Sequence, residues 1–445
     1  MSIIKPNLSF QQIINMNVGF FGIQYSFGLQ QSAVNPIYDF LGASPDQLPI
    51  LNLAGPVTGL LIQPLIGAIS DRTWHPRFGR RKPFFFIGAL LCSITLFFYP
   101  FSSSLWMAAG LLWVLDVGNN TAMEPYRAFV ADKLPGNQYP SGFLTQSFFT
   151  GLGITLANLS LFVFQKYLPQ GTGKIPYWVY SSFFLGSFCS IASVLWSLKT
   201  TPEIPPTAEE LTALRARKKS IAEPFIEIFN SIKFMPKVMW QLALVYLFQW
   251  YALFCYWQNA SKSIAQSVWH TSNAADPKLY QEAVGWTGLV NGWYNIVTFL
   301  SAFGLVWLTK KYTPKLVHLS CLVLAGLALL AFPQIENKYL LFLPMVGFGI
   351  AWASMMAVPY LMVVGDIPKE KYGVYMGVIN MMIVIPMILQ TLTFGFVLKN
   401  FLGNNPGTAI SFAGVLLLLA ALATSLIKSK PVQSEDIMLS GVGGH

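Results

Sequence analysis

The feature that most constrains this chain is a series of about twelve stretches, each of roughly 20 mainly apolar residues. A helix needs about 20 such residues to cross the hydrocarbon layer of a membrane. Only 10% of the 445 residues are charged and 54% are hydrophobic, whereas soluble domains average about 25% charged residues. We therefore predict an all-α membrane protein whose spans begin near Gln11, Leu48, Phe84, Leu105, Gly142, Tyr177, Pro236, Val284, Pro314, Leu340, Tyr372 and Thr408.

The positions of the basic residues predict the orientation of these spans. Most of the 28 lysines and arginines fall in the loops on the same side as the N-terminus, and positive charge close to a span resists translocation. We expect both termini in the cytoplasm, in a plasma membrane or a bacterial inner membrane. The net charge of +10 lies in short gaps between apolar runs. This pattern favours a lipid bilayer, and not nucleic acid, as the partner. The start of the chain has no small-residue cleavage site, so we expect no removable signal peptide.

The chain divides into two similar halves. Pro125-Tyr126 is followed by Asp132, and Pro359-Tyr360 is followed at the same spacing by Asp366. This match predicts an internal repeat of two halves with roughly six helices each. We assign residues 1–200 to the N-terminal half, 201–235 to a cytoplasmic linker, 236–430 to the C-terminal half and 431–445 to a flexible tail. The linker contains a capping box at Thr207–Glu210 and an apolar face from Pro224 onward, so we expect short helices on the membrane surface.

The loop after the second span carries a motif that is not explained by topology alone. It reads Gly67-Ala-Ile-Ser-Asp71-Arg72 and, a few residues on, Gly79-Arg80-Arg81-Lys82. A loop that only fixes orientation has no use for an aspartate and glycines. The motif resembles the loop between spans two and three of major facilitator transporters, with a short insert as in the sucrose/proton symporters. The resemblance implies the major facilitator fold, with twelve helices around a central cavity. It also implies a gate in which charged groups clamp helix ends, formed by Gly67, Asp71, Arg72, Gly79, Arg80, Arg81, Asp132 and Asp366.

The fourth span carries charged residues in the middle of the membrane. At about 100° per residue, Asn120, Met123 and Arg127 return to the face of Asp116. Such groups are costly inside a membrane unless they face a polar cavity, so a transport path is the default explanation. Glu124 stands three residues from Arg127 and can neutralise it. A static ion pair is the alternative for these two residues.

A family resemblance gives these residues roles. The run Leu115-Asp116-x-x-Asn119-Asn120, followed by Pro125-x-Arg127, is similar to span four of plant sucrose/proton symporters and their animal and bacterial relatives. The resemblance implies that Asp116 carries the proton and that Arg127 lies in the substrate path. Glu124, as a second acidic residue on the same span, is the next proton-coupling candidate on its own chemistry. The sequence departs from the family at Glu124, where plant members usually have glycine, and in the seventh span, which lacks the acid that many members have.

Polar and aromatic side chains in several spans are candidates for binding a sugar. Sugar hydroxyls need directional partners, and the ring faces pack on aromatic side chains. An equally open interpretation is that the amides join neighbouring helices. The substrate-binding candidates are Gln24, Gln31, Asn35, Asn119, Asn120, Arg127, Trp250, Trp257, Asn291 and Asn295.

These patterns together predict a proton-coupled symporter that imports a disaccharide such as sucrose, maltose or a related α-glucoside by alternating access. A sodium-coupled glycoside or uronide carrier and a non-transporting sugar sensor stay open as alternatives. We expect a monomer with no cofactor and no metal, and with the proton as coupling ion. The four cysteines lie singly in apolar runs, and the sequence has no metal cluster or nucleophile constellation, so we do not expect an enzyme.

Overall fold

The computed structural model describes residues 5–42, 51, 54–168, 175–216, 222–272 and 275–428. The described residues contain twelve long helices, from 17 residues in α4 to 35 in α11. The helices are α1 (Phe10–Phe40), α3 (Ala54–Asp71), α4 (Lys82–Phe98), α5 (Leu105–Lys133), α6 (Tyr139–Tyr167), α7 (Tyr177–Thr200), α10 (Lys237–Val268), α11 (Pro277–Lys311), α12 (Pro314–Ala331), α13 (Phe342–Val363), α14 (Tyr372–Asn400) and α15 (Pro406–Ser425). Two short helices, α8 (Ala208–Ala216) and α9 (Glu223–Lys233), lie between α7 and α10. The expected tail at 431–445 and part of the basic linker, residues 217–221, lie outside the described residues.

The long helices confirm the predicted all-α membrane fold. Most begin within a few residues of the predicted starts; α11 differs most, beginning at Pro277 and not near Val284. Its extra turns are possible because the Asp276 carboxylate accepts a hydrogen bond from the Leu279 N–H at 3.1 Å, which caps a polar extension of the apolar run. Among the described residues, nine helices are long and apolar enough to cross a membrane. The other three long helices are α1, α3 and α5.

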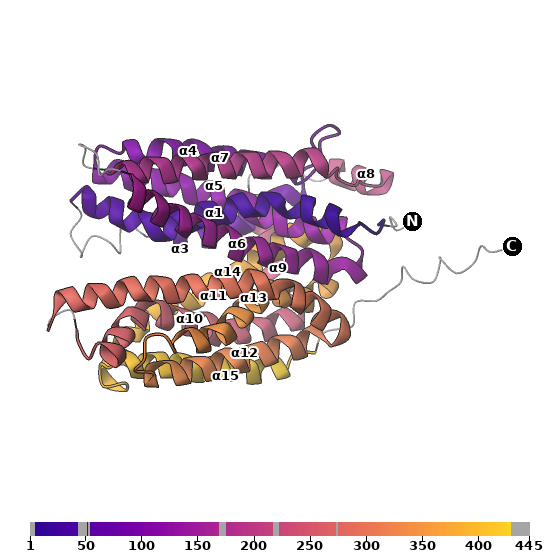
Figure 1. Cartoon of the computed structure of the whole chain (residues 1–445). Coiled ribbons are helices and arrows are strands. Elements are labelled where there is room, and N and C mark those ends of the chain that lie inside the picture. The colour runs from indigo at the N-terminus through magenta and orange to yellow at the C-terminus, as the bar shows by residue number, and fades with distance from the viewer. Residues whose placement is uncertain are drawn as a thin grey trace. The chain divides into compact units, whose positions relative to one another are not determined.

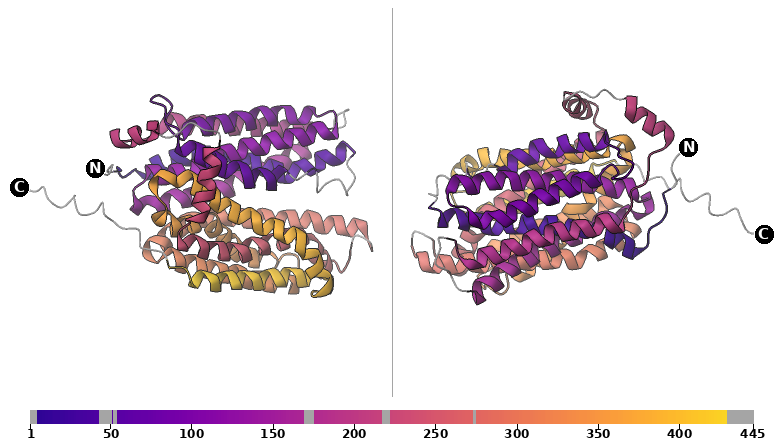
Figure 2. Two further views of the ribbon diagram at one scale, coloured as in Figure 1. Left: turned by 180° about the vertical axis from the view of Figure 1, so that it is seen from behind. Right: turned by 90° about the horizontal axis from the view of Figure 1, so that it is seen from above.

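The chain forms two compact units, which we describe separately. Unit 1 comprises residues 1–236, 363–380 and 429–445, and unit 2 comprises residues 237–362 and 381–428. In unit 1, α1 packs against α6 and α7, α4 packs against α5 and α7, and α3 packs against α5. In unit 2, α15 packs against α10 and α12. Within each unit the long helices run side by side along most of their length (Figures 1 and 2).

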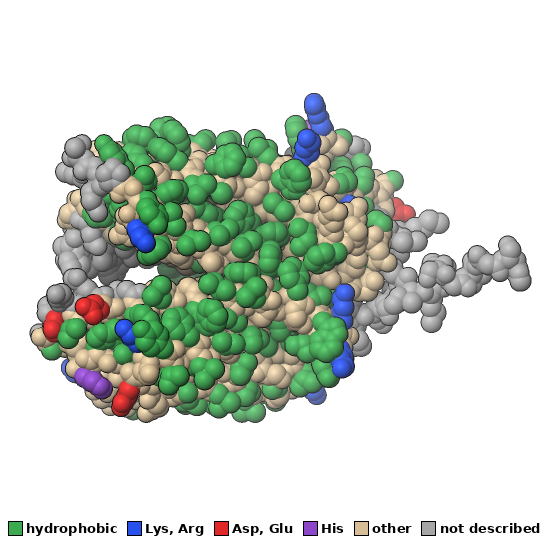
Figure 3. Space-filling model, in the orientation of Figure 1, with side chains coloured by type: hydrophobic (Ala, Val, Ile, Leu, Met, Phe, Trp, Pro, Cys, Tyr) green, Lys and Arg blue, Asp and Glu red, His purple; other side chains and the backbone are tan. Residues whose placement is uncertain are grey.

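The outer surface of the helices is apolar. Hydrophobic side chains cover most of the face shown in Figure 3, and charged side chains lie mainly toward the two ends of the helices. Large side chains such as Leu392 and Leu343 are 77% and 73% exposed. Contiguous apolar surface of this extent is unfavourable in water and matches a lipid-facing surface.

The linker helices form as the sequence predicts. The Thr207 hydroxyl accepts a hydrogen bond from the Glu210 N–H at 3.1 Å, and the Glu210 carboxylate accepts one from the Thr207 N–H at 2.9 Å. This confirms the capping box at the start of α8. On α9, the side chains of Phe225, Ile226 and Phe229 are exposed, which gives this helix the apolar face expected at a membrane surface.

Candidate transport and gating sites

Asp116 lies at the centre of a buried polar cluster in unit 1. It sits in the middle of α5, and its side chain is only 1% exposed. Its Oδ1 accepts a hydrogen bond from Gln30 Nε2 of α1 at 2.9 Å. In the part of the chain that the structure describes, its buried Oδ2 has no hydrogen-bond partner. A carboxylate held by one oxygen, with the second oxygen unoccupied, has the geometry of a site that can take up and release a proton.

The amides around Asp116 come from three helices. Asn120 donates to the Asp116 backbone carbonyl at 2.8 Å and to Thr58 Oγ1 of α3 at 3.0 Å, and its Oδ1 accepts from Gln63. Asn119 Nδ2 donates to Gln30 Oε1 at 3.4 Å. The cluster therefore joins α1, α3 and α5, the three long helices that fall short of the hydropathy of a membrane span. Their polar residues lower that hydropathy and also build the cluster.

Glu124 and Arg127 form a separate ion pair on α5. Arg127 Nη1 lies 2.7 Å from Glu124 Oε1, and both side chains are buried. This contact matches the pairing expected from their three-residue spacing. The charge of Arg127 is therefore already balanced by Glu124 within the same helix.

The sugar-binding candidates predicted on α1 lie in different surroundings. Gln24 is buried, with its Nε2 4.0 Å from the Met123 sulfur, whereas Gln31 is exposed. The side chain of Asn35 lies outside the described part of the structure. Gln30, which the sequence analysis did not single out, donates the hydrogen bond to Asp116, and the role of Gln31 in sugar binding stays a prediction. Adjacent helical residues point about 100° apart, and sequence spacing alone did not fix which of them faces α5.

The aromatic candidates gather on α10 in unit 2. Trp352 of α13 packs edge-on against both Trp250 and Trp257, with ring centroids 5.9 and 5.6 Å apart. Nearby, Asn291 Oδ1 accepts a hydrogen bond from the Tyr256 hydroxyl at 2.8 Å. Asn295 donates to the Asn291 backbone carbonyl at 2.9 Å. Asn291 thus joins α10 and α11, as in the interhelical interpretation, whereas Asn295 bonds within its own helix. Trp352 joins the aromatic group that the sequence indicated.

Asp71 and Arg81 form the centre of the gate motif in unit 1. The Asp71 carboxylate accepts hydrogen bonds at 2.9 Å from the N–H groups of Gly373 and Val374, in the first turn of α14. Arg81 is fully buried and pairs with Asp71 at 2.6 Å and with Asp132 at 2.7 Å. Burial alone would lower the pKa of Arg81, but Asp132 and Asp71 outweigh it and raise this pKa, so the guanidinium stays charged. One carboxylate thus caps α14 and also pairs with the loop before α4.

Small residues let α3 and α14 approach closely beside this ion pair. A Cβ atom placed on Gly67 would lie 2.1 Å from the Gly373 carbonyl oxygen, and one on Gly377 would lie 2.3 Å from Cα of Pro64. These distances are too short for any side chain. Gly373 and Gly377 form the small-xxx-small pattern typical of close membrane helix pairs.

A second acidic cap, Glu203, holds the start of α4. Its carboxylate accepts hydrogen bonds from the N–H groups of Arg80 at 2.8 Å, Arg81 at 2.9 Å and Lys82 at 2.9 Å. Gly79 precedes this turn with a φ of +80°, and a Cβ there would lie 2.4 Å from Glu203 Oε1. Gly79 is therefore required both by its left-handed backbone and by the closeness of the cap.

Removing this cap should destabilise the protein measurably. We expect Glu203→Ala to lower the free energy of unfolding by about 1–2 kcal/mol, because three backbone donors lose their acceptor. Thermal unfolding in detergent measures the change. Glu209→Ala, on an exposed position of α8, is the matched control and should stay within about 0.5 kcal/mol of wild type. Equal stability of the two variants would contradict the capping role.

The remaining gate residues divide into two groups. Arg72 Nε pairs with Glu227 of α9 at 2.5 Å, and its Nη2 lies 3.4 Å from Glu223 Oε2. Arg72 thus ties α3 to the linker helix and not to α14. Arg80 enters the cluster through its backbone N–H. The structure gives Asp366 no ion pair within the described ranges, although its repeat counterpart Asp132 pairs with Arg81.

Several residues of these clusters escaped the sequence analysis. Gln30, Thr58 and Gln63 are uncharged and stand in otherwise ordinary apolar runs. Glu203 stands alone after its span, and no spacing indicates which helix it caps. Gly373 and Gly377 could have been recognised in the sequence, because small residues at this spacing are typical of closely packed helix pairs.

Comparison with known proteins agrees with this architecture. Residues 16–391 match the Major Facilitator Superfamily. The sucrose transport protein SUT5 of Oryza sativa subsp. indica is 24% identical over 492 residues, covering 95% of this chain and 88% of the relative. The sucrose transport protein SUC4 of Arabidopsis thaliana is 24% identical, covering 92% of this chain and 89% of the relative.

Solved structures resemble the fold as well. The Major Facilitator Superfamily transporter FucP, in its outward conformation, has a TM-score of 0.68 at 14% identity, covering 95% of this chain and 99% of that one. The proton:xylose symporter XylE has a TM-score of 0.64 at 14% identity, covering 94% of this chain and 95% of that one.

This chain belongs to the Major Facilitator Superfamily. It is a multi-pass membrane transporter and not an enzyme. The predicted family and fold class are thereby confirmed, and the chain is similar along most of its length to plant sucrose transport proteins.

Proposed function

We propose that this protein is a proton-coupled symporter that imports a neutral disaccharide, such as sucrose, maltose or a related α-glucoside, by alternating access. The observation that carries the proposal is the geometry of Asp116: a buried carboxylate with one oxygen bonded to Gln30 and the other without a partner among the described residues. In this proposal Asp116 carries the coupling proton, and Gln24, Asn119, Asn120 and Arg127 contribute to the sugar path, with Trp250 and Trp257 packing against sugar rings. The protein acts as a monomer with both termini in the cytoplasm.

The charges of the described residues support a neutral substrate. Arg127, the cation that a uronate would need, is already neutralised by Glu124 at 2.7 Å. The polar groups around Asp116 are amides and a hydroxyl, which suit sugar hydroxyls. Both relatives compared above are named sucrose transport proteins.

Uptake and competition measured in reconstituted vesicles test the substrate. We expect an inward proton gradient to stimulate uptake of labelled sucrose, and a tenfold excess of maltose to compete for it. Glucuronate at the same concentration is the matched control and should leave uptake unchanged, because the Arg127 cation of the proposed sugar path is already paired with Glu124. Competition by uronates alone would overturn the assignment of a neutral disaccharide.

The same vesicles separate the alternative functions. A carrier coupled to sodium would respond to a sodium gradient and would resist a protonophore. A sugar sensor would bind sucrose without moving it across the membrane. Either outcome would overturn proton-coupled symport.

A further inference from the structure

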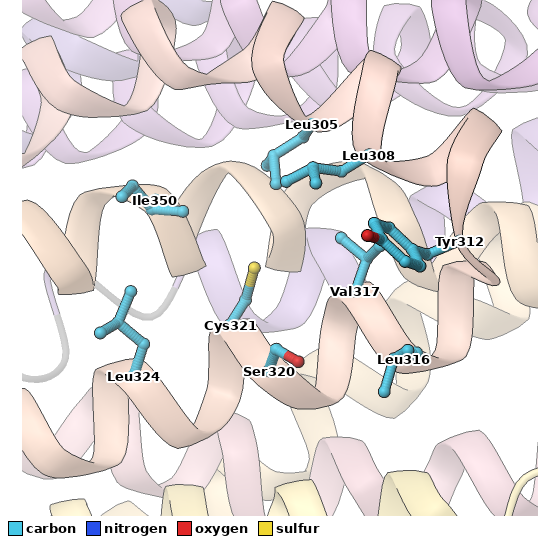
Figure 4. A pocket seen from close by; sticks show the side chains of 9 residues that line it. All are labelled: Leu305, Leu308, Tyr312, Leu316, Val317, Ser320, Cys321, Leu324 and Ile350. Atoms are coloured by element: carbon cyan, nitrogen blue, oxygen red, sulfur yellow. The ribbon is translucent and has the colours of Figure 1, made fainter.

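An apolar groove runs along the outer surface of unit 2, apart from the clusters described above. It has a volume of about 380 Å³ and lies where α11, α12 and α13 meet (Figure 4). Its walls are mainly aliphatic and include Leu305, Leu308, Leu316, Leu324 and Ile350. Leu316 and Leu324 are 49% and 41% exposed, so the groove opens onto the lipid-facing surface. An opening of this kind suits a hydrocarbon chain and offers too few polar partners for a sugar.

One end of the groove carries positive charge and aromatic rings. Tyr312, which lines the groove, directly follows Lys310 and Lys311 in the last turn of α11. The Lys311 ammonium lies 5.0 Å from the ring centroid of Trp307 and 5.5 Å from that of Tyr312. Lysine, tryptophan and tyrosine gathered at one helix end are typical of the membrane interface.

These two lysines have no acidic partner among the residues that the structure describes. In the described residues no ion pair involves Lys310 or Lys311, whereas the nearby Lys315 donates to the backbone carbonyls of Ser425 and Ile427 at 2.9 and 3.0 Å. Within the described residues of unit 2, a ligand for this end of the groove must therefore bring its own negative charge.

The acidic residues of unit 2 lie too far away to supply that charge. Asp276 and Glu282 stand at the start of α11, and Glu336 stands between α12 and α13. At 1.5 Å per residue, the 35 residues of α11 separate its two ends by about 50 Å. This distance is several times the Debye length of about 8 Å at physiological salt.

We propose that the groove binds one anionic phospholipid from the bilayer leaflet that meets this end of α11. One acyl chain lies in the groove against the leucines of α11 and α12, and the headgroup phosphate lies at Lys310 and Lys311. Trp307 and Tyr312 mark the depth of the interface. A zwitterionic lipid fills the groove equally well, but its net charge is zero, so the two lysines select against it.

Lipid titration of the purified full chain tests this proposal. Phosphatidylglycerol or phosphatidylcholine is added to the protein in detergent, and bound lipids are counted by native mass spectrometry. We expect wild type to bind phosphatidylglycerol about tenfold or more tightly than phosphatidylcholine. Each basic residue near an anionic surface contributes a factor of about five. Lys311→Gln should therefore weaken phosphatidylglycerol binding about fivefold, and the double variant Lys310→Gln/Lys311→Gln about twentyfold.

Two further variants separate the headgroup from the acyl chain. Ser320→Phe places a ring in the groove at an exposed position of α12, and it should weaken both lipids alike without changing their ratio. Lys237→Gln removes an exposed lysine at the start of α10 and should match wild type.

Three results would overturn the proposal. The first is equal binding of both lipids to wild type, and the second is equal loss of affinity in Lys237→Gln and Lys311→Gln. The third is displacement of phosphatidylglycerol by glycerol phosphate at the same concentration, because a site for free phosphate would not need the groove. The first and third measurements use wild type alone and do not depend on how any variant folds.

Discussion

Replacing Asp116 with asparagine should abolish the accumulation of sugar while leaving the protein inserted and folded. The substitution keeps the shape of the side chain and removes its ability to bind a proton. One proton moving down about 150 mV releases roughly 3.5 kcal/mol, which supports accumulation of about 300-fold. We expect this ratio to fall to about one in Asp116→Asn vesicles, measured with labelled sucrose under an inward proton gradient. The alkalinisation of the medium that accompanies sugar uptake should also disappear.

Downhill exchange and a second carboxylate variant provide the controls. Exchange of labelled for unlabelled sugar needs no net proton movement, so it should persist in Asp116→Asn and prove that the variant is folded. Glu124→Gln is the matched variant two turns further along α5. Because Glu124 already pairs with Arg127 at 2.7 Å, this change should lower the rate of sugar uptake. The residual uptake should still depend on the proton gradient. If Asp116→Asn still accumulates sugar with unchanged pH dependence, another group carries the proton, and Glu124 becomes the next candidate.

The second large effect is expected at Asp71, where transport should slow without loss of sugar affinity. Asp71 accepts hydrogen bonds from two N–H groups at the start of α14 and pairs with the buried Arg81. Hydrogen bonds to charged groups contribute about 1.5–3 kcal/mol. If these contacts form in only one gate state, Asp71→Asn shifts the equilibrium between states by this amount. We expect the uptake rate at saturating sugar to fall about tenfold or more, and the affinity measured in detergent to change less than twofold.

Arg72→Gln is the matched comparison for this gate variant. Arg72 follows Asp71 directly but contacts Glu223 and Glu227 of α9, in a partly exposed pair. Because these contacts join α3 to α9 and do not reach the start of α14, the uptake rate should fall less than in Asp71→Asn, by about threefold or less. A large loss of sugar affinity in Asp71→Asn with normal turnover would place Asp71 in the binding site. Equal effects of both variants would contradict the specific role of the α14 cap.

The sequence by itself determined the helices and the family. Hydropathy and the distribution of lysine and arginine depend only on local composition, because each helix satisfies its own backbone hydrogen bonds and responds to lipid as a separate segment. The capping box at Thr207–Glu210 and the Glu124–Arg127 pair were predictable for the same reason, since both join residues three positions apart on one helix. The sequence also identified Asp116 and Asp71 as residues whose charge needs an explanation.

Only the tertiary structure decided which partner each of these charges has. Gln30 of α1 donates a hydrogen bond to Asp116, and the backbone N–H of Gly373, about 300 residues away in the sequence, donates one to Asp71. Glu203, which the sequence did not single out, caps α4. Each of these contacts joins different helices, so it depends on how far each helix rotates and how closely its neighbours approach. One residue of sequence changes the direction of a side chain by about 100°. The spacing of Gly373 and Gly377 indicates a close helix pair, but it does not indicate that Gly67 of α3 is the partner.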